Sequence, residues 1–108
     1  MKFLFPKKIT LCGSDFDIVY DKKQSGASFS FSFNSKPGRI VLGTREINID
    51  KTAYLNNILH ELSEIIHCGM RQRFRYTDND SNYLFSYDHR GFTTHTEILA
   101  EAIQKFIK

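Results

Sequence analysis

The chain has 108 residues, of which 41% are apolar and 25% charged, with ten Phe, five Tyr and no Trp. This length and composition predict one globular domain over residues 1–108 and exclude a disordered chain or a repeat array. The net charge of +3 is too weak to indicate nucleic-acid binding by itself. No apolar stretch is long enough for a membrane span, and two cysteines without a CxxC spacing exclude a disulfide scaffold. We therefore expect a reduced, cytoplasmic protein with no membrane partner.

The first half of the chain has the two-residue period of β-strands. Ser28–Phe33 alternates Ser and Phe, so that three Phe share one face of a half-buried strand. Asn34–Gly38 contains Pro and Gly in a turn arrangement. We predict a small antiparallel sheet within residues 8–50. Its expected strands cover residues 9–11, 16–20, 28–33, 39–42 and 46–49.

The period changes to 3.6 residues at Asp50. From residue 51 to about residue 70, apolar side chains recur at steps of three and four, which predicts an amphipathic helix of roughly five turns. Asp50 or Thr52 is the expected N-cap. A second amphipathic helix is expected over residues 94–107, beginning at Thr94. The fold class is therefore α+β, with a small antiparallel sheet followed by a long helix and a C-terminal helix.

The long helix carries an unusual polar face. At about 100° per residue, His60, Glu64 and His67 lie within roughly 60° of one another, and Glu61 flanks them. A solvated face would ordinarily contain Lys or Arg, but there is none between residues 53 and 70. His and a carboxylate at positions i and i+4 have the spacing that allows both side chains to bind one metal ion. An ordinary solvated face is the alternative.

The string His-Glu-Leu-Ser-Glu, residues 60–64, resembles the HExxH helix of zincin-type metallopeptidases, with Glu64 where the second His would be. The β-rich start, this helix and a last helix reading HTEILAEAI are similar to small phage and prophage proteins with a minimal zincin-like core. The resemblance covers residues 8–107. It implies a Zn²⁺ ion bound by His60 and Glu64, and Glu61 as the general base for a metal-bound water in peptide hydrolysis.

A catalytic zinc has three protein ligands, so a third is expected outside the long helix. His95 falls inside the apolar arc of the last helix and is therefore predicted to point inward, toward His60 and Glu64. A buried His that only satisfies a backbone carbonyl is the alternative. His89, in a loop-like Asp-His-Arg-Gly segment, is the second candidate.

His67 lies about 10.5 Å along the helix axis from His60, which is too far for the two to share one ion without strain. We interpret it as a residue that lines the cleft, supports a ligand or simply belongs to the polar face. Glu64-x-x-His67 also matches half of a di-iron carboxylate signature, but no second ExxH occurs in the chain.

Three function classes follow from these patterns. The first is a zinc-dependent, peptidase-like hydrolase acting on a peptide or protein, in a bacterial or phage-infected cell. The second is a phage-encoded binding protein on the same scaffold, with a structural or vestigial metal site, and the Glu64 replacement supports it. The third is nucleic-acid binding through the basic and aromatic run Arg71–Tyr76, although one such run is more often solvated surface.

Overall fold

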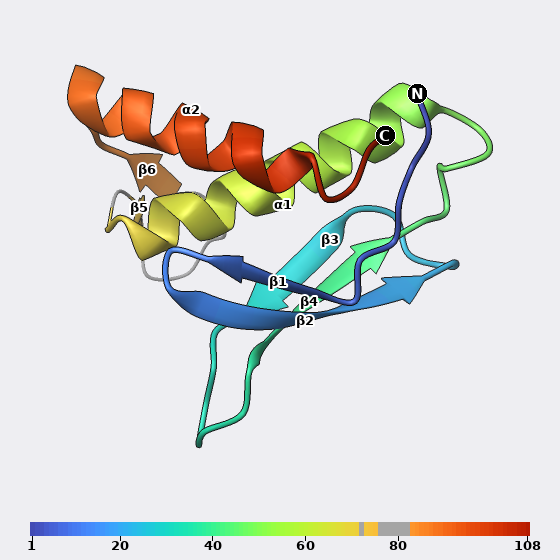
Figure 1. Cartoon of the computed structure of the whole chain (residues 1–108), viewed down its shortest axis with the longest axis horizontal. Coiled ribbons are helices and arrows are strands. Elements are labelled where there is room, and N and C mark those ends of the chain that lie inside the picture. Colours follow the sequence, from blue (N-terminus) through green and yellow to red (C-terminus); the bar gives the residue numbers. More distant parts are fainter. Residues whose placement is uncertain (72, 76–82) are drawn as a thin grey trace.

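The computed structural model describes residues 1–71, 73–75 and 83–108. It is an α+β fold in which two helices cover one face of a four-stranded sheet, as Figure 1 shows. The predicted fold class is therefore confirmed. The elements are β1 Lys8–Leu11, β2 Ser14–Asp21, β3 Ala27–Ser30, β4 Gly38–Gly43, α1 Lys51–Gly69, β5 Arg73–Arg75, β6 Tyr83–Phe85 and α2 His89–Ile103.

The four-stranded sheet contains both parallel and antiparallel pairs, which corrects the expectation of an antiparallel sheet. Its order is β1-β2-β4-β3, and the two central strands β2 and β4 run parallel, with Ile18 opposite Ile40. The outer pairs β1·β2 and β3·β4 are antiparallel. The period-2 pattern is the same for either direction, so it defines which side chains face the core but not which strands become neighbours.

One hydrophobic core lies between the sheet and the helices. The apolar face of α1 packs on the inward side chains of the strands, and α2 adds Ala102. Phe106, which follows α2, is 1% exposed, and its carbonyl accepts a hydrogen bond from the N–H of Leu4 at 2.7 Å. The most deeply buried large side chains are Tyr54, Phe16, Phe106, Leu42, Ile58, Leu62, Ile65 and Ile66.

The ends of the helices depend on two aspartates. The predicted N-cap Asp50 is confirmed, since its Oδ1 accepts a hydrogen bond from the N–H of Ala53 at 3.1 Å. The predicted start of α2 at Thr94 is wrong, because Asp88 caps the helix by accepting from the N–H of Gly91 at 2.8 Å. The extra first turn contains His89, so this residue lies on a helix and not in a loop.

Two of the strands expected from the sequence, residues 46–49 and 28–33, differ from what the structure shows. Residues 46–49 form hydrogen-bonded turns, in which the N–H of Ile49 bonds to the carbonyl of Glu46 at 2.9 Å. The Ser/Phe segment forms a strand only over Ala27–Ser30, and Phe33 is 76% exposed in the following loop. Continued pairing would bring residue 32 opposite Pro37, which has no N–H to donate.

β5 and β6 form a separate antiparallel pair that follows α1. The tyrosine- and phenylalanine-containing segment Tyr83–Phe85 forms β6. The basic and aromatic run at residues 71–76 falls partly outside the described residues, since residues 72 and 76 are not among them.

Candidate functional site

A groove of about 320 Å³ lies along the polar face of α1. The side chains that α1 contributes include His60, Glu64 and His67, the three residues grouped from their helical spacing. Phe85 of β6 and Leu99 of α2 complete it. The full lining is Asn56, Leu59, His60, Ser63, Glu64, His67, Phe85 and Leu99.

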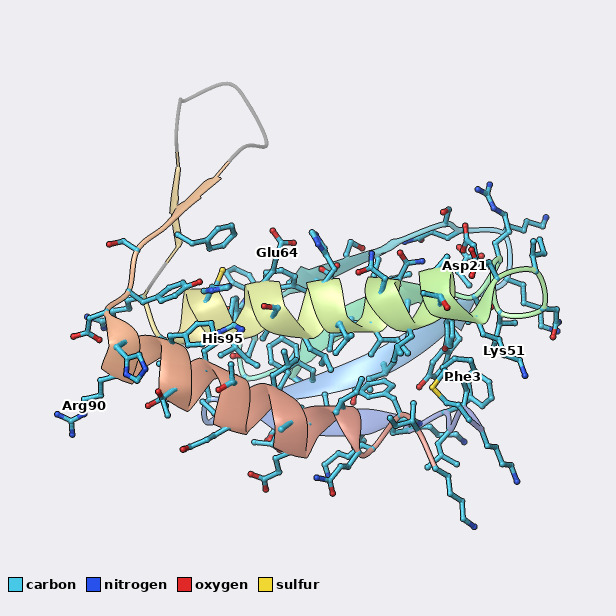
Figure 2. All side chains as sticks on the ribbon, turned by 90° about the horizontal axis from the view of Figure 1, so that it is seen from above. Phe3, Asp21, Lys51, Glu64, Arg90 and His95 are labelled. Carbon is cyan, nitrogen blue, oxygen red and sulfur yellow. The ribbon has the colours of Figure 1, made fainter. Side chains whose placement is uncertain are left out.

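His60 and Glu64 face each other across one helical turn. The distance between His60 Nε2 and Glu64 Oε2 is 3.4 Å, and the side chains are 66% and 22% exposed. In Figure 2, Glu64 projects outward from α1. The predicted i,i+4 pairing is therefore present. An imidazole nitrogen and a carboxylate oxygen are both donors that zinc accepts, and both are open to the groove.

Glu61 lies elsewhere. It is 4% exposed and lines a small cavity in the core together with Ile40, Leu42 and Phe106. It does not line the groove. The next position along a helix turns by about 100°, which carries Glu61 from the groove side of His60 toward the sheet. The role of Glu61 as a general base therefore stays a prediction.

His95 points inward, as its place in the apolar arc of α2 predicts. It is 6% exposed, and Figure 2 shows it directed from α2 toward α1. Its Nε2 lies 2.8 Å from the Oγ of Ser63, and its Nδ1 is buried without a hydrogen-bond partner among the described residues. Ser63 was missed in the sequence, although its position three residues after His60 puts it on the same helix face.

His67 is packed in a stack of rings. Its ring centroid is 4.1 Å from that of His95, 4.4 Å from that of Phe85 and 5.4 Å from that of Tyr87. Both of its ring nitrogens are buried. His67 thus lines the groove, as one of its sequence-based interpretations proposed, and it also supports His95.

Both of these histidines are shifted toward the neutral form. Burial lowers the pKa of His95, and the neighbouring His67 lowers it further. Burial also lowers the pKa of His67, and a hydrogen bond with the backbone of Ser63 raises this pKa by a smaller amount. Neutral imidazole is the form that binds a metal ion, so this chemistry suits a ligand at neutral pH.

The donor set of the candidate metal site is divided into two pairs. His60 and Glu64 form one pair, and His67 and His95 form the other. Over residues 1–71, 73–75 and 83–108, no three His, Cys, Asp or Glu side chains come together as a group that could hold a metal ion. The structure thus places two of the three predicted ligands side by side and does not bring His95 or His89 into a group with them.

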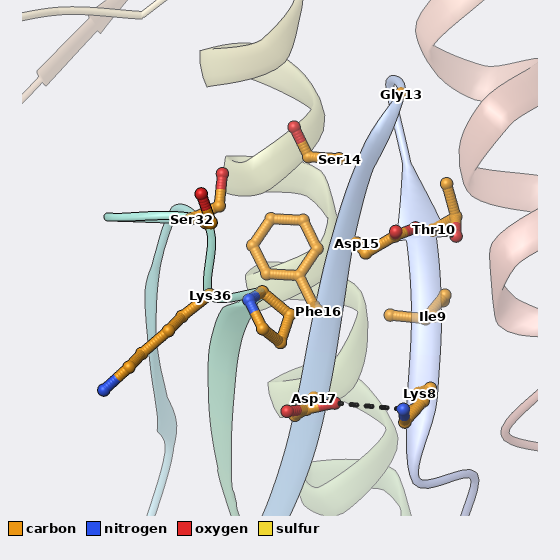
Figure 3. A pocket seen from close by; sticks show the side chains of 12 residues that line it. Lys8, Ile9, Thr10, Gly13, Ser14, Asp15, Phe16, Asp17, Ser32 and Lys36 are labelled. Carbon is orange, nitrogen blue, oxygen red and sulfur yellow. Dashed lines mark hydrogen bonds and ion pairs between the residues drawn. The ribbon is translucent and has the colours of Figure 1, made fainter.

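A hollow larger than the groove lies elsewhere in the described part of the chain. It measures about 630 Å³ and lies between the β1–β2 hairpin and the loop after β3, as Figure 3 shows. Its charged side chains include Lys8 and Asp17, which form an ion pair at 4.0 Å. None of the predicted site residues lines it, so we assign the candidate site to the groove on α1.

No protein-family model matches the chain, and neither does any curated protein or solved structure. The site is therefore interpreted from its own residues. Within the described residues, no helix is both long and apolar enough to cross a membrane.

Proposed function

We propose that the protein is a zinc-dependent, peptidase-like hydrolase of the cytoplasm whose active site is the groove on α1. The observation that carries this proposal is the pairing of His60 and Glu64, with a nitrogen and an oxygen donor 3.4 Å apart at the wall of a groove. The buried Nδ1 of His95, which has no hydrogen-bond partner among the described residues, supports it as well. An unpaired polar atom in a buried site is costly unless something binds it.

In this proposal, His60 and Glu64 would hold the ion at the groove wall. Since His95 does not line the groove, its side chain would have to move toward this pair to contribute Nδ1 as the third ligand. The donors fit zinc by type, since it takes imidazole nitrogen and carboxylate oxygen. When bound, zinc would supply a Lewis acid for the carbonyl group of a substrate. The groove would take a peptide, with Leu99 and Phe85 as apolar contacts beside the polar wall.

Glu61 remains our candidate for the general base, because it follows His60 directly as in the HExxH pattern. A general base must come within hydrogen-bond reach of the proton that it removes. Glu61 is buried beneath α1, so the proposal requires its side chain to move toward the groove when substrate binds.

A binding protein on the same scaffold is the second candidate. The separation of His95 from the His60–Glu64 pair favours it, because no three-ligand group forms among the described residues. In that case the groove would bind a peptide or protein partner without cleaving it.

Zinc titration of the purified full chain tests the first step. We expect one Zn²⁺ per chain in the wild type and a large loss of affinity in His60→Ala, Glu64→Ala and His95→Ala. His89→Ala is the matched control, because His89 is an exposed histidine on α2 that does not line the groove. Wild-type affinity in His60→Ala would refute the site.

A panel of fluorogenic peptides with and without a chelator tests the second step. The hydrolase proposal expects cleavage that stops when zinc is removed and returns when it is restored. Zinc binding without cleavage of any peptide, combined with peptide binding in the groove, would instead support the binding-protein alternative.

A further inference from the structure

A row of nearly parallel rings lies beside the groove, at the end of the molecule where β6 leads into α2 (Figure 1). The ring of Tyr87 lies 5.4 Å from that of His67 with the planes 22° apart, and 5.9 Å from that of Phe92 with the planes 21° apart. Phe85 packs on His67 with the centroids 4.4 Å apart. We call these four residues the ring row, which joins α1, β6 and α2.

The outer members of the ring row are open to solvent. Phe85, Tyr87 and Phe92 are each nearly half exposed. Parallel rings with centroids this far apart are offset, so part of each ring face stays uncovered. Single exposed apolar side chains are common on protein surfaces, but a contiguous group of them indicates a binding surface. Tyr87 and Phe92 do not line the groove, so this surface extends beyond it.

The strand that pairs with β6 is basic. β5 contains Arg73 and Arg75, and Arg73 is opposite Phe85 in the register of the antiparallel pair. Arg71, between α1 and β5, is exposed. Backbone pairing thus brings the basic run at residues 71–75 beside aromatic rings that come later in the chain.

Two carboxylates close to the ring row already have partners. Asp88 accepts the hydrogen bond of the Gly91 N–H, and Glu64 faces His60. Asp78 and Asp80 lie outside the described residues. The arginines of residues 71–75 therefore remain available to a ligand with negative charge.

Flat rings beside arginines suit a ligand that combines planar groups with phosphates. Bases of single-stranded nucleic acid stack on aromatic side chains, while arginine pairs with the phosphate backbone. In a duplex the faces of the bases are covered by their neighbours, so unpaired bases are the ones that can stack on protein rings. A neutral peptide could cover the same rings, but it would leave the arginines without a counter-charge.

We propose that the ring row and the adjacent basic run bind single-stranded nucleic acid, with bases stacked on Tyr87 and Phe92 and phosphates beside residues 71–75. Binding of this kind goes beyond the proposed function and needs no metal ion.

Fluorescence anisotropy of the full chain with a labelled oligo(dT) of about ten nucleotides measures this binding. A fully abasic strand of the same length carries the same charge without the bases. We expect oligo(dT) to bind at least about 5-fold more tightly than the abasic strand, because each stacked base contributes to affinity. Equal binding of the two strands, or no binding of oligo(dT), overturns the proposal.

Variants of the ring row test the stacking. Tyr87→Ala and Phe92→Ala should each weaken oligo(dT) binding by about 5- to 150-fold, whereas Tyr87→Phe keeps the ring and should remain close to the wild type. Phe33→Ala is the matched control, since Phe33 is an exposed phenylalanine in the loop after β3. Urea denaturation verifies that each variant is folded. Undiminished binding in both alanine variants overturns the proposal.

The salt dependence of binding tests the basic run. Arg71→Gln and Arg73→Gln should each reduce the slope of log affinity against log salt by about 0.7, the value for one lost phosphate contact on a single strand. Arg39→Gln, which removes an exposed arginine of β4, should leave the slope unchanged. Equal slopes in all of these proteins overturn the role of the basic run.

A neutral phenylalanine-containing peptide distinguishes the other occupant of the rings. If this peptide binds and Tyr87→Ala abolishes its binding, while oligo(dT) does not bind, the ring row is a peptide site and the proposal is wrong. A chelator is present throughout, so these results do not depend on the zinc site of the proposed function.

Discussion

The imidazole rings of His67 and His95 lie against each other, with centroids 4.1 Å apart and ring planes at 30°. One ring belongs to α1 and the other to α2, so the pair is part of the contact between the helices. Two protonated rings at this distance would repel each other. Burial lowers the pKa of both side chains, which keeps them neutral at pH 7.

This pair predicts a loss of stability in mild acid. Both histidines have a pKa below 6.5 in the folded protein, and they should titrate near 6.5 in the unfolded chain. Between these values the unfolded state binds more protons, so the free energy of unfolding falls as the pH falls. The stabilisation is fully present above about pH 6.5 and is lost progressively below it, which urea denaturation at a series of pH values would measure.

His67→Phe is the matched variant for this measurement. It keeps an aromatic ring against His95 and removes one of the two groups whose pKa is lowered. We expect a shallower decline in acid than in the wild type. An identical slope in both proteins would show that the pair does not control the pH dependence.

Glu61→Gln tests the general base. Glutamine keeps the shape of the side chain but cannot accept a proton, so we expect hydrolysis to fall by about 100-fold or more with zinc content unchanged. His60→Ala should lose both zinc and activity, because it removes a ligand. Since Glu61 is buried, the free energy of unfolding is measured in parallel. Undiminished turnover in a folded Glu61→Gln protein would exclude Glu61 as the base.

Asp88 should stabilise the start of the helix that carries His95. Its carboxylate accepts the hydrogen bond of the Gly91 N–H at 2.8 Å, so Asp88→Ala should lower the free energy of unfolding by about 1 kcal/mol. Asp88→Asn, which retains an acceptor, should remain close to the wild type. Equal stability of the two variants would contradict the capping role.

Gly43, the last residue of β4, should not tolerate a side chain. A Cβ atom there would overlap the backbone carbonyl oxygens of Gln24 and Gly26, and the N–H of Gly43 already donates to Gly26 at 2.7 Å. We expect Gly43→Ala to destabilise the protein by about 1–3 kcal/mol in urea denaturation, because the backbone has to shift. Ser28→Ala, an exposed change on the neighbouring strand β3, should have little effect, and equal losses would argue against steric overlap.

The features that could be predicted from the sequence depend on residues close together in the chain. The long helix and its N-cap at Asp50 follow from apolar spacing and one side chain that reaches the third residue ahead. The facing of His60 and Glu64 follows from the helical repeat alone. The inward direction of His95 follows from its place on the apolar arc of its own helix.

The contacts that these elements and side chains make with distant parts of the chain were determined only by the tertiary structure. The strand order, with β2 parallel to β4, depends on pairing between segments about twenty residues apart. Glu61 is buried because α1 packs against both the sheet and α2, which together cover more of the helix than its apolar pattern indicates. The contact of Ser63 with His95 joins positions 32 residues apart. A hydrogen bond of that kind needs two helices placed to within a few tenths of an ångström, and no local pattern of residues contains that information.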